Sequence, residues 1–183
     1  MPTGALSSLT LLPVAELLDL ARRGRLRPRL PSRSAWDDRR RLDFLDGLGQ
    51  GRPAGALVLA PGASGPSEVR LGRWTLSAPA SDAVLWVVDG QQRLGALLEA
   101  LRTPGPGEPR AEVELSTLRV RPGRPGDDRQ GELPGLGASD RVPLAVALDP
   151  VALMAWCRLH PIDDEPLGRL LAWAEALRHT PLP

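Results

Sequence analysis

The stretch from residue 83 to residue 101 constrains the fold of this chain more than any other segment. It begins with the unbroken apolar run Ala-Val-Leu-Trp-Val-Val at 83–88, passes through Asp89-Gly90, and then carries leucines at 94, 97, 98 and 101. This order predicts a buried strand, a tight turn and an amphipathic helix over 91–102. At 183 residues the chain is long enough to bury one sizeable core around such a unit.

The turn at Asp89-Gly90 is a candidate binding site for an anion. The first backbone N–H groups of a helix lack partners within the helix, and the helix dipole places positive charge at the same end. Arg93, in the first turn, adds a planar guanidinium that can hold a phosphate through two hydrogen bonds. Ordinary turns show the same pattern, with the Asp capping the helix and the Gln and Arg side chains exposed. The local chemistry leaves both interpretations open.

The rest of the chain predicts helices interspersed with strands. We expect further helices over 13–23, 37–50, 150–158 and from 164 onward, the last of which buries Leu167, Leu170, Leu171, Ala174 and Leu177. We expect strands over 55–60, 68–71 and 112–120, the last with one irregularity, and surface loops over 61–66 and 121–140. This succession predicts an α+β (mixed α/β) domain.

A dense group of arginines precedes and enters the second predicted helix. Nine of them fall between residues 22 and 41, at 22, 23, 25, 27, 29, 33, 39, 40 and 41. Such a cluster can neutralise nucleic-acid phosphates. The chain also has no Lys, Asn or Tyr, a bias that a GC-rich genome explains, and its net charge is only +1. We therefore favour a solvated, partly helical surface over a DNA-coating one.

The other reactive residues give weaker signals. Cys157 is the only cysteine, which excludes an internal disulfide and fits a reducing compartment. His160 and His179 have no companion at metal-ligand spacing, and Asp163-Asp164-Glu165 is explained as a negatively charged helix start. No run approaches the roughly 18 apolar residues of a membrane span, and the first residues lack the pattern of a signal peptide. We expect a cytoplasmic protein.

The run Asp89-Gly90-Gln91-Gln92-Arg93 after a hydrophobic strand resembles the signature of the N-terminal domain of GmrSD-type restriction enzymes. That domain is a ParB/sulfiredoxin-like module with a small mixed sheet and flanking helices. Three weaker motifs extend the resemblance over most of residues 10–160. They are Arg27-Pro28-Arg29-Leu30 with Trp36, the segment 51–59 (Gly-Arg-Pro-Ala-Gly-Ala-Leu-Val-Leu), and Val142-Pro143-Leu144.

The chain also departs from the family pattern. Aligned on Trp36, the family's Gln-Arg pair falls on Pro31 and Ser32, and Arg33 sits one place too late. Relatives continue into further strands and often into an HNH-type nuclease region. We therefore expect residues 1–160 to form the ParB/sulfiredoxin-like domain and residues 161–183 to form a helix that starts a missing continuation.

The resemblance implies a domain that binds or hydrolyses a nucleoside triphosphate with Mg²⁺. It would be the sensor of a modification-dependent, anti-phage DNA restriction system, with DNA and a separate or missing HNH-type nuclease as partners. Asp89, Gln92 and Arg93 would be catalytic, and Asp89 would hold the metal ion. The nucleotide would be held by Asp89, Gly90, Gln91, Gln92, Arg93, Arg33 and Trp36. Two alternatives stay open: a non-catalytic nucleotide- or DNA-binding regulator, and a degenerate remnant.

Overall fold

The strand predicted over 83–88 is the centre of a three-stranded sheet. The computed structural model describes residues 12–29, 36–72, 74–100, 111–123 and 140–182. In it, β6 (Ser81–Asp89) lies between β2 (Leu26–Pro28) and β3 (Val58–Ser64). β2 runs parallel to β6 and β3 runs antiparallel to it, with Val58 opposite Asp89. The end of β2, the start of β3 and the end of β6 therefore share one edge of the sheet.

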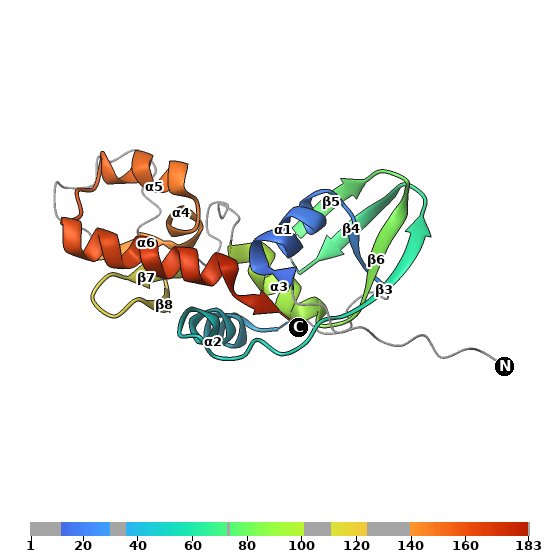
Figure 1. Ribbon diagram of the computed structural model, residues 1–183, viewed down its shortest axis with the longest axis horizontal. Coiled ribbons are helices and arrows are strands. Elements are labelled where there is room, and N and C mark those ends of the chain that lie inside the picture. The colour runs from blue at the N-terminus through green and yellow to red at the C-terminus, as the bar shows by residue number, and fades with distance from the viewer. Residues whose placement is uncertain (1–11, 30–35, 73, 101–110, 124–139, 183) are drawn as a thin grey trace.

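A hairpin and two helices complete what we call the first lobe (Figure 1). β4 (Ser67–Leu71) pairs antiparallel with β5 (Trp74–Ala78), and α1 (Val14–Arg22) and α3 (Gln91–Ala100) lie beside the strands. The helices bury the apolar faces that their spacing predicts, and their side chains meet those of the strands in one core. Its most buried members include Leu17, Leu26, Leu71, Val87, Leu94 and Leu97.

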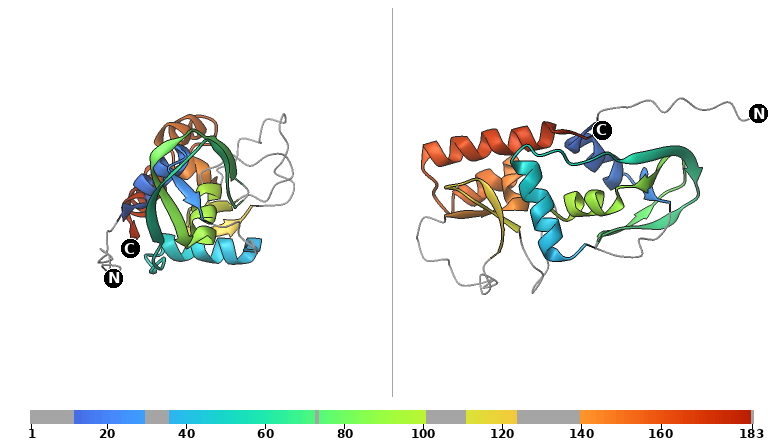
Figure 2. Two further views of the ribbon diagram at one scale, coloured as in Figure 1. Left: turned by 90° about the vertical axis from the view of Figure 1, so that its right-hand side faces the viewer. Right: turned by 90° about the horizontal axis from the view of Figure 1, so that it is seen from below.

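The rest of the chain forms the second lobe. β7 (Ala111–Glu114) lies between β8 (Arg119–Pro122) and β9 (Arg141–Pro143), and it is antiparallel to both. The helix α4 (Leu144–Ala147) packs on this sheet, and α5 (Pro150–Cys157) and α6 (Asp164–His179) both contact α4. α2 (Asp38–Gly49) contacts both α3 and β8, and so it joins the two lobes (Figure 2). β1 (Leu12–Pro13) pairs with β10 (Pro181–Leu182).

The arrangement confirms the predicted α+β class, with helices and several small sheets in one structure. Two predicted helix starts are confirmed in detail. Asp37 caps α2 by accepting a hydrogen bond from the Arg40 backbone N–H, and Asp149 caps α5 by accepting from Val151 and Ala152. Within the residues described, no helix combines the length and the apolarity needed to cross a membrane.

Three predictions of local structure are wrong. The expected loop at 61–66 is largely strand, because β3 runs through Pro61 to Ser64. β3 is an edge strand, where a proline removes no ladder hydrogen bond that a neighbour needs. The expected single strand at 112–120 is the hairpin β7–β8, whose turn holds Leu118 at a φ of 53°. Leu171 is 43 % exposed rather than buried. The strands β5 and β9 have no counterpart in the prediction.

Arg27 is the largest of the fully buried side chains, at 1 % exposure. Its guanidinium donates hydrogen bonds to the carbonyls of buried Gly24 and of two turns, and to two serine hydroxyls. These acceptors are Gly24 O, Gly65 O, Pro79 O, Ser64 Oγ and Ser67 Oγ. Because four of the acceptors lie at the β3–β4 and β5–β6 connections, one arginine ties β2 to both. A buried charge is tolerated when hydrogen bonds satisfy it, as they do here.

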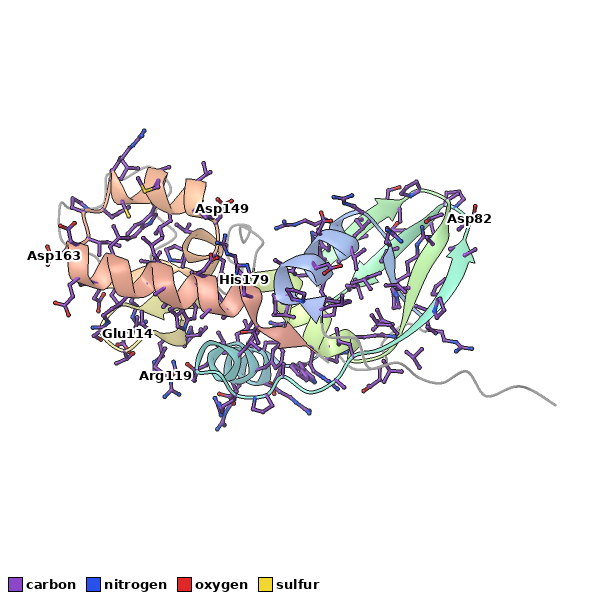
Figure 3. The ribbon with its side chains drawn as sticks, in the orientation of Figure 1. Asp82, Glu114, Arg119, Asp149, Asp163 and His179 are labelled. Atoms are coloured by element: carbon purple, nitrogen blue, oxygen red, sulfur yellow. The ribbon has the colours of Figure 1, made fainter. Side chains whose placement is uncertain are left out.

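As Arg27 links the strands of the first lobe, the carboxylate of Asp46 links α2 to the second lobe. The buried Asp46 of α2 receives three hydrogen bonds from the Arg119 guanidinium, at 2.6–2.9 Å, and one from the Val120 backbone N–H at 2.9 Å. Figure 3 shows Arg119 beside α2. Burial alone raises the pKa of Asp46. The hydrogen bonds from Arg119 and Val120, with the charges of Arg119 and Arg52, outweigh burial and hold that pKa below its ordinary value.

Candidate nucleotide-binding site

The predicted strand, glycine turn and helix are present between β6 and α3. Gly90 has a φ of +90°, and the first helical hydrogen bond runs from the Leu94 N–H to the Gly90 carbonyl at 3.0 Å. A Cβ at Gly90 would lie 2.3 Å from the Leu57 Cδ2 atom. Position 90 therefore requires glycine for two reasons: the positive φ of its backbone and the close approach of the segment before β3. We call residues 89–93 the β6–α3 corner.

Arg93 lies in this corner, and its guanidinium contacts the protein itself. Its Nη1 atom donates to the Ala56 carbonyl, and its Nη2 atom lies 3.2 Å from the Asp89 Oδ2 atom. The Arg93 side chain is 22 % exposed and that of Asp89 is 68 % exposed. Gly55, at a φ of +75°, leaves room for the guanidinium, since a Cβ there would lie 2.9 Å from Nη1. Two of the three predicted catalytic groups, Asp89 and Arg93, are therefore brought together as an ion pair.

The two glutamines of the corner also hold the local structure. The Gln91 Nε2 atom donates to the Val87 carbonyl at 3.2 Å. The Gln92 Oε1 atom accepts a hydrogen bond from the Trp36 backbone N–H at 2.9 Å. This bond places Trp36, from the start of α2, beside α3. The Trp36 ring packs edge-to-face on Phe44, with 5.4 Å between ring centroids.

A small pocket opens beside this contact, on the face of α3 that carries Gln92. It has a volume of about 130 Å³, and Trp36, Gly95 and Gly72 line it together with Arg41 and Glu99. The Arg41 Nη1 atom lies 3.2 Å from the Glu99 Oε2 atom, and both side chains are largely buried. The pocket thus presents an aromatic ring and an ion pair next to the corner.

Arg29 lies at the edge of the sheet where β2 and β6 end, and it was not among the site residues predicted from the sequence. It follows β2 directly, its backbone N–H donates to the Val87 carbonyl at 3.1 Å, and the residue is exposed. Because β2 is parallel to β6, Arg29 lies at the same edge of the sheet as Asp89. The signal in the sequence was its position in the Arg-Pro-Arg-Leu motif. Arg33, which the resemblance places at the nucleotide, lies outside the described residues.

The arginines between 22 and 41 do not form one basic face. They are distributed over α1, β2 and α2, and several are committed to the protein. Arg27 is buried, Arg23 pairs with Asp19, and Arg41 pairs with Asp38 and Glu99. The Arg40 guanidinium lies over the Trp36 ring, 4.9 Å from its centroid. The preference for a non-DNA-coating surface agrees with this distribution.

The residues outside the corner show no second reactive centre in the described part of the chain. Burial raises the pKa of the Cys157 thiol, as suits a core thiol. His160 stacks on Trp156 with 4.3 Å between ring centroids. Among the described residues, no three His, Cys, Asp or Glu side chains gather in a way that could hold a metal ion.

Comparison with known proteins adds no family assignment. No protein-family model matches the chain, and no curated protein matches it closely enough to count as a relative. The site is therefore described by its own geometry.

Proposed function

We propose that the β6–α3 corner binds the phosphates of a nucleoside triphosphate, as the sensor domain of a modification-dependent, anti-phage DNA restriction system. The observation that carries the proposal is the corner itself: a strand ends at an exposed carboxylate, a glycine turns the chain, and a helix starts with an arginine in its first turn. Helix starts of this kind attract anions through their N–H groups and dipole.

The ion pair between Asp89 and Arg93 is compatible with ligand binding. It joins residues four apart, and Asp89 is 68 % exposed. Exposed pairs of this spacing contribute only about 0.3–0.5 kcal/mol. A phosphate carries more charge than a carboxylate and accepts the same two-pronged contact, so it replaces Asp89 at the guanidinium at little cost. The bond to the Ala56 carbonyl keeps the guanidinium at the corner during this exchange.

Other groups extend the proposed site on either side of the corner. Arg29 supplies a second positive charge at the same edge of the sheet, where an outer phosphate would lie. Asp89, released from Arg93, is the carboxylate available to Mg²⁺, and the ion would take most of its remaining ligands from the phosphates and water. Gln92 and Trp36 both line the small pocket beside the corner. We place the restriction system in the cytoplasm, with DNA and an HNH-type nuclease as its partners.

The test is titration calorimetry with ATP, GTP, CTP and UTP, with and without Mg²⁺. Arg93→Ala is expected to weaken binding about tenfold or more, because a hydrogen bond to a charged group contributes roughly 1.5–3 kcal/mol. Arg29→Ala is expected to weaken it by a smaller factor. Arg158→Ala, on the exposed end of α5, is the control with the same charge change. An unchanged dissociation constant for Arg93→Ala contradicts the assignment.

Asp89→Asn separates the two roles given to that carboxylate. Without Mg²⁺ the variant is expected to bind nucleotide more tightly than the wild type, because a competitor for Arg93 and a repulsive charge are both removed. With Mg²⁺ it is expected to bind more weakly, because a metal ligand is lost. If Asp89→Asn has no effect in either condition, Asp89 does not face the phosphates.

A second candidate is a regulator that binds nucleotide without hydrolysing it. The observation that favours it is the commitment of Arg93 to the Ala56 carbonyl and to Asp89, which suits a fixed binding surface. Phosphate release, measured with and without DNA, distinguishes the two. Turnover that Arg93→Ala abolishes supports the enzyme, and tight binding without turnover supports the regulator.

A further inference from the structure

A larger cavity lies at the opposite end of α3, where the two lobes meet. Its volume is about 360 Å³, within the range of small-molecule sites. Apolar side chains from α1, α3, α4 and α6 make most of its wall, chiefly Val14, Leu18, Leu97, Leu144, Leu148 and Leu177. Ligand sites occur preferentially where such groups of elements join. The β6–α3 corner is at the first turn of α3, so this cavity is a separate site.

Two arginines give the cavity a positive rim. Arg22 ends α1, and its guanidinium makes no hydrogen bond or ion pair to any other residue that the structure describes. Arg178 lies in the last turn of α6, and its Nη2 atom binds Glu175. Both arginines are among the residues that line the cavity.

The rim also contains one carboxylate, that of Asp149. Figure 3 shows Asp149 at the start of α5 and His179 at the end of α6. Asp149 accepts hydrogen bonds from the Val151 and Ala152 backbone N–H groups, at 2.9 and 3.0 Å, as the cap of α5. Asp149 forms no ion pair with Arg22, so the rim carries two positive charges and one negative charge among the described residues. The cavity is therefore apolar at its wall and cationic at its mouth.

We propose that this cavity binds a small amphiphilic carboxylate, with a hydrocarbon chain among the leucines and its carboxylate between Arg22 and Arg178. The hydrocarbon part of the ligand fits the apolar wall, because its burial there removes hydrocarbon from water. The uncommitted Arg22 guanidinium, with Arg178 as a second arginine of the rim, explains the anionic end, since guanidinium groups hold carboxylates in a two-pronged contact. This site does not depend on nucleotide binding.

The test is calorimetry on the full chain with octanoate, and with octanol as the neutral ligand of equal length. Octanoate is expected to bind at one site, and octanol at least about tenfold more weakly, because it lacks the charge-assisted contact. Arg178→Gln and Arg22→Gln are each expected to weaken octanoate binding and to leave octanol binding unchanged. Arg158→Gln, far from the cavity on the exposed end of α5, is the matched control.

A blocking variant locates the ligand. Ala15 lines the cavity from an exposed position on α1, so Ala15→Trp fills the mouth without replacing a core residue. It is expected to abolish octanoate binding while the melting temperature stays within a few degrees of the wild type. The proposal is overturned if octanoate does not bind at millimolar concentration, or if Ala15→Trp leaves its binding unchanged. Equal affinities for octanoate and octanol would overturn the anionic assignment.

Discussion

Replacing Arg27 tests whether a buried guanidinium holds the first lobe together. Arg27→Met keeps most of the apolar volume and removes the whole set of hydrogen bonds to Gly24 O, Gly65 O, Pro79 O, Ser64 Oγ and Ser67 Oγ. Gly24 is buried, so its carbonyl is left without a partner, at a cost of roughly 1–3 kcal/mol. The other acceptors lie in partly exposed turns, where water replaces the lost donors.

The expected net loss is about 3 kcal/mol of unfolding free energy. Losing the links to the exposed turns adds roughly 1–2 kcal/mol to the cost at Gly24, and relief from desolvating a cation offsets part of the sum. For a chain of this length that loss lowers the melting temperature by about 6–12 °C. Urea unfolding followed by circular dichroism measures the free energy, and a thermal scan measures the temperature.

Arg25→Met is the matched control for this experiment. Arg25 lies two residues earlier, and its Nε atom donates a single hydrogen bond to the Ala83 carbonyl at 3.0 Å. Its replacement is expected to cost about 1 kcal/mol or less. If the two variants lose the same unfolding free energy, the hydrogen bonds of Arg27 do not contribute the stability assigned to them.

Two further predictions concern Asp46 and Gly90. The pKa of Asp46 is lower in the folded protein, so its stabilising contribution is present at neutral pH and disappears as pH falls through that lowered pKa. The urea midpoints of Asp46→Asn and wild type should therefore differ at pH 7 and converge toward pH 3, and a constant difference would contradict the linkage. Gly90→Ala combines a φ of +90° with a Cβ 2.3 Å from Leu57, and it should cost about 1–3 kcal/mol more than Gly51→Ala, where φ is +73° and the space is open. Equal urea midpoints for the two glycine variants would show that the approach of Leu57 is tolerated.

Local signals account for the parts of the fold that the sequence predicted well. The strand, turn and helix at 83–101 and the helix starts near residues 37 and 150 each depend on residues within a few positions of one another. The same signals misled at Pro61-Gly62, because proline and glycine mark a loop unless the strand happens to be at an edge. Edge position is a property of the finished sheet, and no local window contains it.

In the candidate site, too, contacts between residues close in sequence were predictable, and contacts set by the finished sheet were not. The sequence places Asp89 and Arg93 one helical turn apart, and their ion pair follows from that spacing. The carbonyl that also holds Arg93 belongs to Ala56, 37 residues earlier, and the strand that brings Arg29 to the same edge is parallel to β6. Both contacts depend on sheet topology. Only the family resemblance predicted that Trp36 lies near the residues of the corner.

The oxygens that surround the Arg27 and Arg119 guanidinium groups differ in one property, their response to acid. Those around Arg27 are carbonyls and hydroxyls, which take up no proton at any pH that a protein survives. Those around the Arg119 guanidinium belong to a carboxylate, and Glu114 on the same hairpin also has a lowered pKa, chiefly through its hydrogen bond from Thr117. Acidification should therefore release the β7–β8 hairpin from α2 while the sheet around β6 persists, so that the chain unfolds in two stages rather than one.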